Sequence, residues 1–204
     1  MDDDAQAESN YFNDIIKIFK SNSNLSIGCG VIKNFEDGKY FSRYIKNKVE
    51  DISYNNFDRC LSSAIFFKKN VMKKIDYFDE MFGIGAYYGA SEESDFIIRA
   101  LILDFEVKAF PQPIVYHPKF HVDNLSYSNL RKKGFSYGLG RGALYKKYLS
   151  IKPFWSILNL VRALLLSMSG ILLNIVTLNS RGIYWYIYNL LGRIYGFYKY
   201  SIKI

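Results

Sequence analysis

Hydrophobic positions in the first 120 residues alternate between strand-like runs and helix-like periodicity. Short apolar runs at residues 25–32 and 60–67 have the length and the polar flanks of buried strands. Elsewhere apolar residues recur every three to four positions, as on one face of a helix. We expect helices at about 10–20, 69–75 and 92–103, and strands at 105–110 and 114–117 separated by Pro111 and Pro113. This alternation predicts an α/β architecture.

Two glycines and two irregular segments complete the picture of this region. Gly28 and Gly30 interrupt the first strand, where they would allow another chain segment to approach closely. Residues 34–58 are polar and aromatic without periodicity, and residues 76–90 are rich in glycine and aromatic residues. Both segments are therefore predicted to be loops.

The pattern changes to long helical stretches after about residue 124. Ser126 can cap a helix that reaches about residue 149, although glycines at 134, 138, 140 and 142 should loosen it. Pro153 can begin a second helix. Residues 154–178 would form about 37 Å of helix, enough for a bilayer core of about 30 Å. Residues 183–200 are rich in tyrosine and include Trp185, which is typical of a membrane interface.

The second long stretch is not uniformly apolar. Asn159, Arg162, Ser167, Ser169 and Asn174 interrupt it. One membrane crossing plus an interfacial helix, two helices lying in the membrane plane, and a soluble helical subdomain with an aromatic core all remain open.

Charge divides the chain at nearly the same place. Residues 1–123 contain 15 Lys and Arg and 19 Asp and Glu, a net charge of −4. Residues 124–204 contain 12 Lys and Arg and no acidic residue, which brings the total to +8. Because this basic segment also carries long apolar runs, it favours an anionic membrane surface and argues against nucleic acid. We expect two parts, 1–123 and 124–204.

The two cysteines, Cys29 and Cys60, show neither metal-ligand spacing nor a disulfide framework. We expect both to be buried thiols of a protein in a reducing compartment. The chain opens with Met1 and three aspartates, so no signal peptide is expected in it and membrane contact should come from the second part.

Two acidic clusters carry the candidate chemistry. They are Asp2-Asp3-Asp4 at the start and Glu92-Glu93-Ser94-Asp95 before an apolar helix. Carboxylates grouped this closely repel one another unless they share a cation or a proton. The clusters therefore indicate a site that binds a divalent metal and activates a hydroxyl group.

Four segments in order resemble the family 2 glycosyltransferases, which have the GT-A fold. Residues 1–5 (MDDDA) resemble the metal-binding DxD segment, and residues 78–83 (FDEMFG) resemble the acceptor-side loop. Residues 92–99 (EESDFIIR) resemble the ED-x-DL-x-x-R helix start, with Glu93 in place of the usual Asp. Residues 115–117 (VYH) resemble the strand-end V-x-H motif.

The resemblance implies a fold and an organisation. The chain would hold the C-terminal part of a GT-A domain, because it begins at the DxD and lacks the preceding strand–helix units that bind the nucleotide. A separate donor-binding polypeptide is then an expected partner. No Q-x-x-R-W follows the acidic helix, which argues for single-sugar transfer and against a processive synthase.

The resemblance also assigns a metal centre. Asp4, with Asp2 nearby, would hold magnesium or manganese at the diphosphate of the donor. His117, at a strand end, would be a further ligand or a phosphate contact.

The acceptor side would use the second acidic cluster. Glu93 is the expected general base for the acceptor hydroxyl, with Glu92 as the alternative. Asp79, Glu80 and Asp95 would contact the acceptor. Asp95 also has a structural alternative, a pair with the arginine four residues further on.

The implied activity is inverting, non-processive transfer of a sugar from a nucleotide-sugar to a glycan or lipid-linked acceptor, in bacterial cell-surface polysaccharide synthesis. It would take place at the cytoplasmic face of the cell membrane. Lys132, Lys133 and Arg141 could contact lipid headgroups or the diphosphate of a lipid-linked acceptor. The alternative from another class is a non-catalytic membrane-bound remnant or partner subunit.

Overall fold

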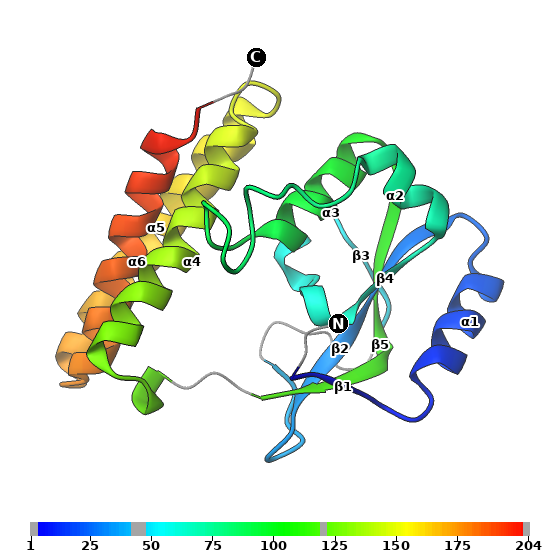
Figure 1. Cartoon of the computed structure of the whole chain (residues 1–204), viewed down its shortest axis with the longest axis horizontal. Helices are drawn as coiled ribbons and strands as arrows, with labels where there is room; N and C mark the ends of the chain where they lie inside the picture. Colours follow the sequence, from blue (N-terminus) through cyan, green and yellow to red (C-terminus); the bar gives the residue numbers. More distant parts are fainter. Residues whose placement is uncertain (1–3, 42–47, 119–121, 202–204) are drawn as a thin grey trace. The chain divides into compact units, whose positions relative to one another are not determined.

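The computed structural model describes residues 4–41, 48–118 and 122–201 (Figure 1). It separates into two compact units. The first, called the sheet unit, comprises Met1–Phe78 and Glu93–Phe120, and the second, called the helical unit, comprises Asp79–Glu92 and His121–Ile204. The change between them near residue 120 lies close to the shift in charge and hydropathy along the sequence, while residues 79–92 group with the later helices.

The sheet unit is built around two parallel strands. β2 (Leu25–Asn34) and β5 (Glu106–His117) lie side by side, and β4 (Ile65–Phe67) pairs antiparallel with β2. β1 (Gln6–Ala7) and β3 (Glu50–Asp51) both pair antiparallel with β5. The path through the sheet is β1-β5-β2-β4, so β5 is a central strand.

β5 is one continuous strand, and the prediction of two strands separated by Pro111 and Pro113 is wrong. Between the pairs Cys29–Ala109 and Val31–Ile114, one residue of β2 faces four residues of β5. This irregularity contains both prolines, which cannot donate to the ladder. The facing residue is Gly30, where a Cβ atom would lie 2.2 Å from the Pro113 carbonyl oxygen, so the predicted close approach is present.

Helices cover both faces of the sheet. α1 (Tyr11–Ser21) contributes Phe19, whose ring packs edge-on against Phe66 of β4. The next residue of β4, Phe67, packs against Phe96 of α3 (Glu92–Ile102). Because successive side chains of a strand point to opposite faces, α1 and α3 lie on opposite sides of the sheet. Together with α2 (Lys69–Ile75), these elements confirm the α/β prediction.

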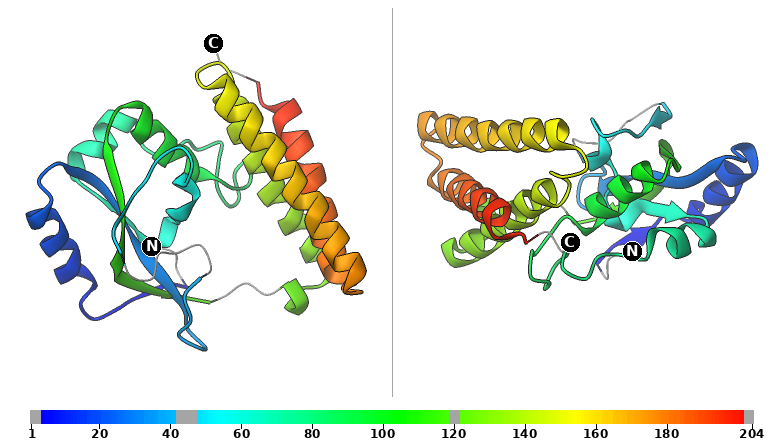
Figure 2. Two further views of the ribbon diagram at one scale, coloured as in Figure 1. Left: turned by 180° about the vertical axis from the view of Figure 1, so that it is seen from behind. Right: turned by 90° about the horizontal axis from the view of Figure 1, so that it is seen from above.

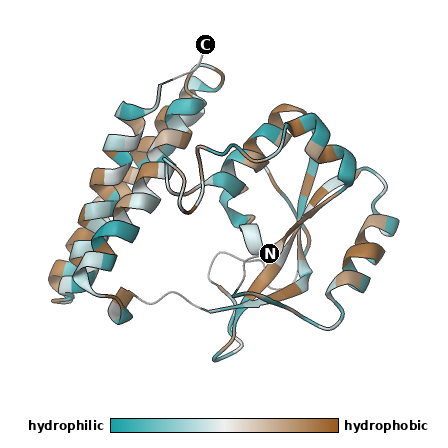
Figure 3. Cartoon of the chain, viewed as in Figure 1, coloured by the Kyte–Doolittle hydropathy of each residue, from teal (hydrophilic) through white to brown (hydrophobic). Residues whose placement is uncertain are grey.

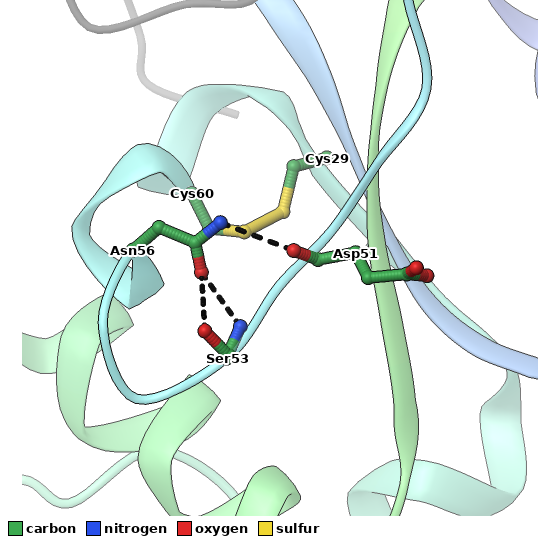
Figure 4. Close-up of a disulfide and its surroundings, with 5 residues drawn as sticks. All are labelled: Cys29, Asp51, Ser53, Asn56 and Cys60. Carbon is green, nitrogen blue, oxygen red and sulfur yellow. Dashed lines mark hydrogen bonds between the residues drawn. A yellow bond between two sulfur atoms is a disulfide. The ribbon is translucent and has the colours of Figure 1, made fainter.

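The segment before β4 differs from the predicted strand at 60–67. Only Ile65–Phe67 is a strand, and helical turns occupy Phe57–Arg59 and Ser62–Ala64. Asn56 holds the first turn, since its Nδ2 donates to the Asp51 carbonyl (3.0 Å) and its Oδ1 accepts from the Ser53 N–H (2.7 Å; Figure 4).

Cys29 and Cys60 form a disulfide, so the prediction of two free thiols is wrong (Figure 4). Both side chains are fully buried, and their Cα atoms are 5.5 Å apart. The bridge joins the centre of β2 to the turn before β4. Spacing in the sequence could not show it, because only the fold brings these positions together. The reducing compartment inferred from free thiols loses its support.

The helical unit contains α4 (Tyr127–Lys147), α5 (Pro153–Val176) and α6 (Ser180–Lys199). α6 packs against both of its neighbours, running in the direction of α4 and opposite to α5 (Figure 2). The predicted start signals operate at α4 and α5: Ser126 Oγ accepts a hydrogen bond from the Asn129 N–H (3.3 Å), and Pro153 occupies the first turn of α5.

The glycines of α4 are packing contacts and do not loosen the helix as predicted. A Cβ atom at Gly138 would lie 2.2 Å from the Asn189 carbonyl oxygen, and one at Gly142 would lie 2.0 Å from that of Arg193. α6 repeats the arrangement with Gly192, whose Cβ would lie 2.2 Å from the Phe135 carbonyl oxygen. The two backbones therefore approach more closely than larger residues would allow.

Among the residues that the structure describes, α5 is the one helix long and apolar enough to cross a membrane. It has 24 residues, a mean hydropathy of 1.8 in its most apolar window, and only 22% of that window buried. Apolar turns are visible on the helices of this unit in the hydropathy view (Figure 3). This supports membrane association of the helical unit.

Candidate functional site

Asp4 and His117 lie together in the sheet unit. β1 pairs antiparallel with the end of β5, with Gln6 opposite Tyr116, and this register brings the residues flanking both strands together. The Asp4 Oδ1 atom is 3.2 Å from His117 Nε2. Two of the predicted metal-site residues, more than a hundred positions apart in the sequence, are therefore neighbours.

The other ring nitrogen of His117 is 2.7 Å from the Pro118 carbonyl oxygen. A carbonyl oxygen only accepts, so Nδ1 carries the proton in this hydrogen bond. A backbone carbonyl commonly holds the Nδ1–H of a histidine whose Nε2 binds a metal. The arrangement thus directs Nε2 toward Asp4 and toward any cation bound there.

The donor atoms define which ion would fit. Asp4 offers carboxylate oxygens, and His117 offers an imidazole nitrogen, a set better suited to manganese than to magnesium. Asp2 lies outside the described residues. Within residues 4–41, 48–118 and 122–201, no group of three or more His, Cys, Asp or Glu side chains is placed to hold a metal ion. Among the described residues, Asp4 and His117 are the two predicted metal ligands that the structure brings together.

Solvent reaches this pair. The Asp4 side chain is 56% exposed and that of His117 is 24% exposed. The ring of Phe41 packs edge-on against the imidazole, with 6.2 Å between ring centroids. One side of the imidazole is thus fixed by an apolar contact while the carboxylate remains accessible to a ligand.

The first turn of α3 carries the candidate bases. Glu93 is half-buried, and its Oε1 accepts a hydrogen bond from the Ser94 hydroxyl at 3.2 Å. Glu92 is also half-buried and lies beside Gly83, where a Cβ atom would be 3.5 Å from the Glu92 carboxyl carbon. Ser91, the residue before α3, has φ +76°, outside the extended region typical of an N-cap residue.

Asp95 is enclosed within the sheet unit. It is fully buried, and its Oδ2 accepts a hydrogen bond from Arg99 Nε at 2.8 Å. Arg99 also donates to the carbonyl oxygen of Ile75, the last residue of α2. This geometry supports the structural alternative for Asp95, a pair that joins α3 to the end of α2.

Asp79 anchors the segment of residues 79–92, called the acceptor loop after the motif that it resembles, to the end of α4. Its Oδ2 is 2.7 Å from Lys147 Nζ, and its Oδ1 accepts from the Met81 N–H at 2.9 Å. Lys147 also lies over the ring of Phe82. Glu80, in contrast, is exposed at the surface. Asp79 thus positions the loop, and Glu80 is accessible to a ligand.

Further contacts fix the acceptor loop on α4. Ser136 Oγ donates to the Gly89 carbonyl at 3.0 Å, and Gly140 lies so close that a Cβ atom there would be 2.3 Å from the Ala90 carbonyl oxygen. The ring of Tyr88 packs against the rings of Phe82 and Tyr200. Burial raises the pKa of the Tyr88 hydroxyl above its ordinary value.

A hollow of about 350 Å³ lies between the acceptor loop and the first turns of α4. Its lining residues are Ile84, Gly89, Leu125, Asn129, Lys132, Lys133, Ser136 and Tyr137. Two cations beside apolar and hydroxyl-bearing side chains suit a ligand with an anionic head and an apolar body. Sequence reasoning selected the two lysines by charge, but the hollow requires the loop to fold back onto α4.

Comparison of the chain with protein-family models, with curated proteins and with solved structures finds no match. The functional assignment therefore depends on the arrangement of the residues described above and on the motif resemblance.

Proposed function

We propose that this chain is the acceptor-side part of a GT-A glycosyltransferase of the family 2 type, which transfers one sugar with inversion from a nucleotide-sugar. The observation that carries the proposal is the pair Asp4–His117, 3.2 Å apart, with His117 Nδ1 facing a backbone carbonyl. This is the placement expected for the DxD and V-x-H motifs if both serve one metal centre.

Each side chain would then have a distinct task. Asp4 and His117 would hold a divalent cation, manganese by donor chemistry, and that cation would offset the negative charge of the departing diphosphate. Glu93, in the first turn of α3, would accept the proton of the acceptor hydroxyl. The Ser94 hydroxyl, 3.2 Å from Glu93 Oε1, would hold that carboxylate in position. Glu92 remains the alternative base.

A lipid-linked acceptor is favoured over a soluble glycan. The acceptor loop belongs to the same compact unit as α5, the apolar helix, and is joined to α4 through Asp79 and Lys147. Lys132 and Lys133 border the hollow beside this loop, where an acceptor phosphate would find positive charge. The acceptor side is thus built on the membrane-associating part of the chain.

We place the reaction at the cytoplasmic face of the cell membrane, because nucleotide-sugars are made there, and in bacterial cell-surface polysaccharide synthesis. The Cys29–Cys60 disulfide is more typical of an oxidising compartment. Acid quenching of cells followed by thiol alkylation of the denatured protein tests this placement. Alkylation of both cysteines supports the cytoplasmic face. Cysteines that are not alkylated because they form the disulfide argue for the non-cytoplasmic face.

Titration calorimetry with a nucleoside diphosphate tests the metal centre. We expect weak binding that requires manganese or magnesium and falls at least about tenfold in Asp4→Asn or His117→Gln, since each change removes one ligand. Asp104→Asn is the matched control, because it neutralises an exposed aspartate that follows α3. Binding that is equal with and without metal would overturn the metal assignment and favour the non-catalytic partner subunit.

A further inference from the structure

The helical unit exposes a broad apolar surface along α5. Its most exposed large side chains include Phe154 (79%), Leu166 (66%), Leu172 (64%) and Val176 (80%). They extend from the first to the last turn of a helix whose apolar window is only 22% buried. An apolar surface of this length marks an interaction site on a folded protein.

α6 extends this surface. Its exposed apolar residues Ile187, Leu191, Ile194 and Tyr198 recur at intervals of three and four, so they form one stripe. The stripe meets α5 at an apolar groove of about 470 Å³. The groove is lined by Lys146, Leu160, Leu164, Ile194, Phe197 and Tyr198. Together, the exposed sides of α5 and α6 form one surface, called the apolar face.

The packing of α4 makes a membrane crossing by this unit unfavourable. α4, α5 and α6 have 21, 24 and 20 residues and pack lengthwise, so a bilayer crossed by α5 would also surround its neighbours. α4 carries Arg141 within its length. Arg131, Lys132 and Lys133 lie near its start, and Lys146 and Lys147 lie at its end. Arg162, near the middle of α5, is itself exposed. Arginine at the centre of a bilayer costs several kcal/mol.

We propose that the helical unit lies on the surface of an anionic membrane, with the apolar face inserted among the acyl chains and α4 on the opposite side of α6, toward water. Charge complementarity selects the partner, since residues 152–199, which hold α5 and α6, carry five Lys and Arg and no acidic residue. In this orientation the long side chain of Arg162, which lies among the exposed apolar residues of α5, would extend toward the headgroups. The inference rests on the helical unit alone and does not require glycosyl transfer.

Flotation with vesicles tests the face. The full chain should float with vesicles of phosphatidylcholine and phosphatidylglycerol, and a bound fraction should persist in 1 M salt because insertion is not screened. The double variant Leu165→Glu/Leu172→Glu should lower binding at least about tenfold. Leu103→Glu is the matched control, since Leu103 is 50% exposed and Leu165 is 54% exposed, and it should bind normally. Complete release of the wild type by salt would overturn insertion.

Labelling of introduced cysteines distinguishes a helical unit that lies on the membrane from one in which α5 crosses it. The native cysteines are in a disulfide, so without reductant a membrane-impermeant maleimide should react only at Lys152→Cys or Ser180→Cys, beyond the two ends of α5. We expect both ends to react in protein bound to sealed vesicles. Protection of one end would overturn the proposal in favour of a crossing helix.

A second copy of the chain is the competing occupant of the apolar face. Light scattering of the lipid-free protein distinguishes it. If the wild type formed a dimer that Leu165→Glu/Leu172→Glu dispersed, and it failed to float with vesicles, the face would belong to the dimer and the membrane proposal would fail. Flotation of the wild type that is lost in the double variant supports the proposal.

Discussion

Glu93 and Asp95 lie two residues apart on α3, yet their carboxylates have very different surroundings. Glu93 is half-buried and accepts a hydrogen bond from its neighbour Ser94. Asp95 is fully buried against Arg99. Positions separated by two residues on a helix point about 200° apart, so one carboxylate can be available for chemistry while the other belongs to the core.

Replacement of the proposed base should affect turnover without affecting the fold. In the chain, or in a version completed with a donor-binding half, Glu93→Gln should lower sugar transfer about 100-fold or more, the scale for a positioned base. Unfolding by urea should be nearly unchanged, because the amide can occupy the same half-buried position. Glu92→Gln is the control and should be milder. An inactive Glu92→Gln beside a nearly normal Glu93→Gln would exchange the two roles.

Asp95→Asn should show the opposite profile. The change removes the charge that pairs with Arg99 in a buried setting, so the free energy of unfolding should fall by about 3 kcal/mol. Urea denaturation of the variant beside wild type and Glu93→Gln provides the measurement. A stable Asp95→Asn that had lost only acceptor binding would restore Asp95 to the acceptor site.

At the scale of whole elements, close packing of α4 and α6 organises the helical unit. Gly138 and Gly142 lie against α6 carbonyl groups, while Gly140, on another side of α4, lies against the acceptor loop. α4 therefore holds the loop on one side and α6 on another. A residue larger than glycine at these positions must separate the backbones.

Gly138→Ala should therefore destabilise the helical unit, even though alanine favours a helix by about 1 kcal/mol over glycine. The new Cβ would lie 2.2 Å from the Asn189 carbonyl oxygen, and overpacking of this kind costs about 1–3 kcal/mol before any gain in propensity. Thermal unfolding followed by circular dichroism measures the change. Ser128→Ala, at an exposed position of α4, should be neutral or slightly stabilising. A more stable Gly138→Ala would contradict the close packing.

At the scale of the whole molecule, the covalent link stabilises the sheet unit. The disulfide joins residues 31 positions apart, and the loop between them includes β3 and the turn held by Asn56. Closing a loop of this length should stabilise the folded state by about 3–4 kcal/mol in the chain-entropy view.

Removal of the disulfide should lower the stability of the sheet unit measurably, while the α/β fold is retained. Cys29→Ala/Cys60→Ala, or reduction of the wild type, should lower the free energy of unfolding by about 3 kcal/mol in urea titrations. Reduction of the double variant should then have no further effect. Equal stability of the oxidised and reduced wild type would show that the bridge adds nothing to the sheet unit.

Local signals in the sequence determined much of this protein. Pro153 and Ser126 mark the starts of α5 and α4 within a residue, because a helix start depends on the chemistry of its own first turn. The strand-like run at 25–32 and the helical spacing at 69–75 likewise correspond to β2 and α2. The break in charge and hydropathy near residue 124 lies close to one boundary between the compact units, whereas no change in composition marks residues 79–92 as part of the helical unit.

Tertiary structure alone decided the features that join distant positions. β5 continues through two prolines because Gly30 on the neighbouring strand leaves room for the irregularity, and Cys29 meets Cys60 only after β2 and the turn before β4 are in place. The motif resemblance grouped Asp4 with His117, but the β1–β5 register is what brings their atoms to 3.2 Å. Such contacts depend on chain segments far apart in sequence, and no local pattern encodes their distance.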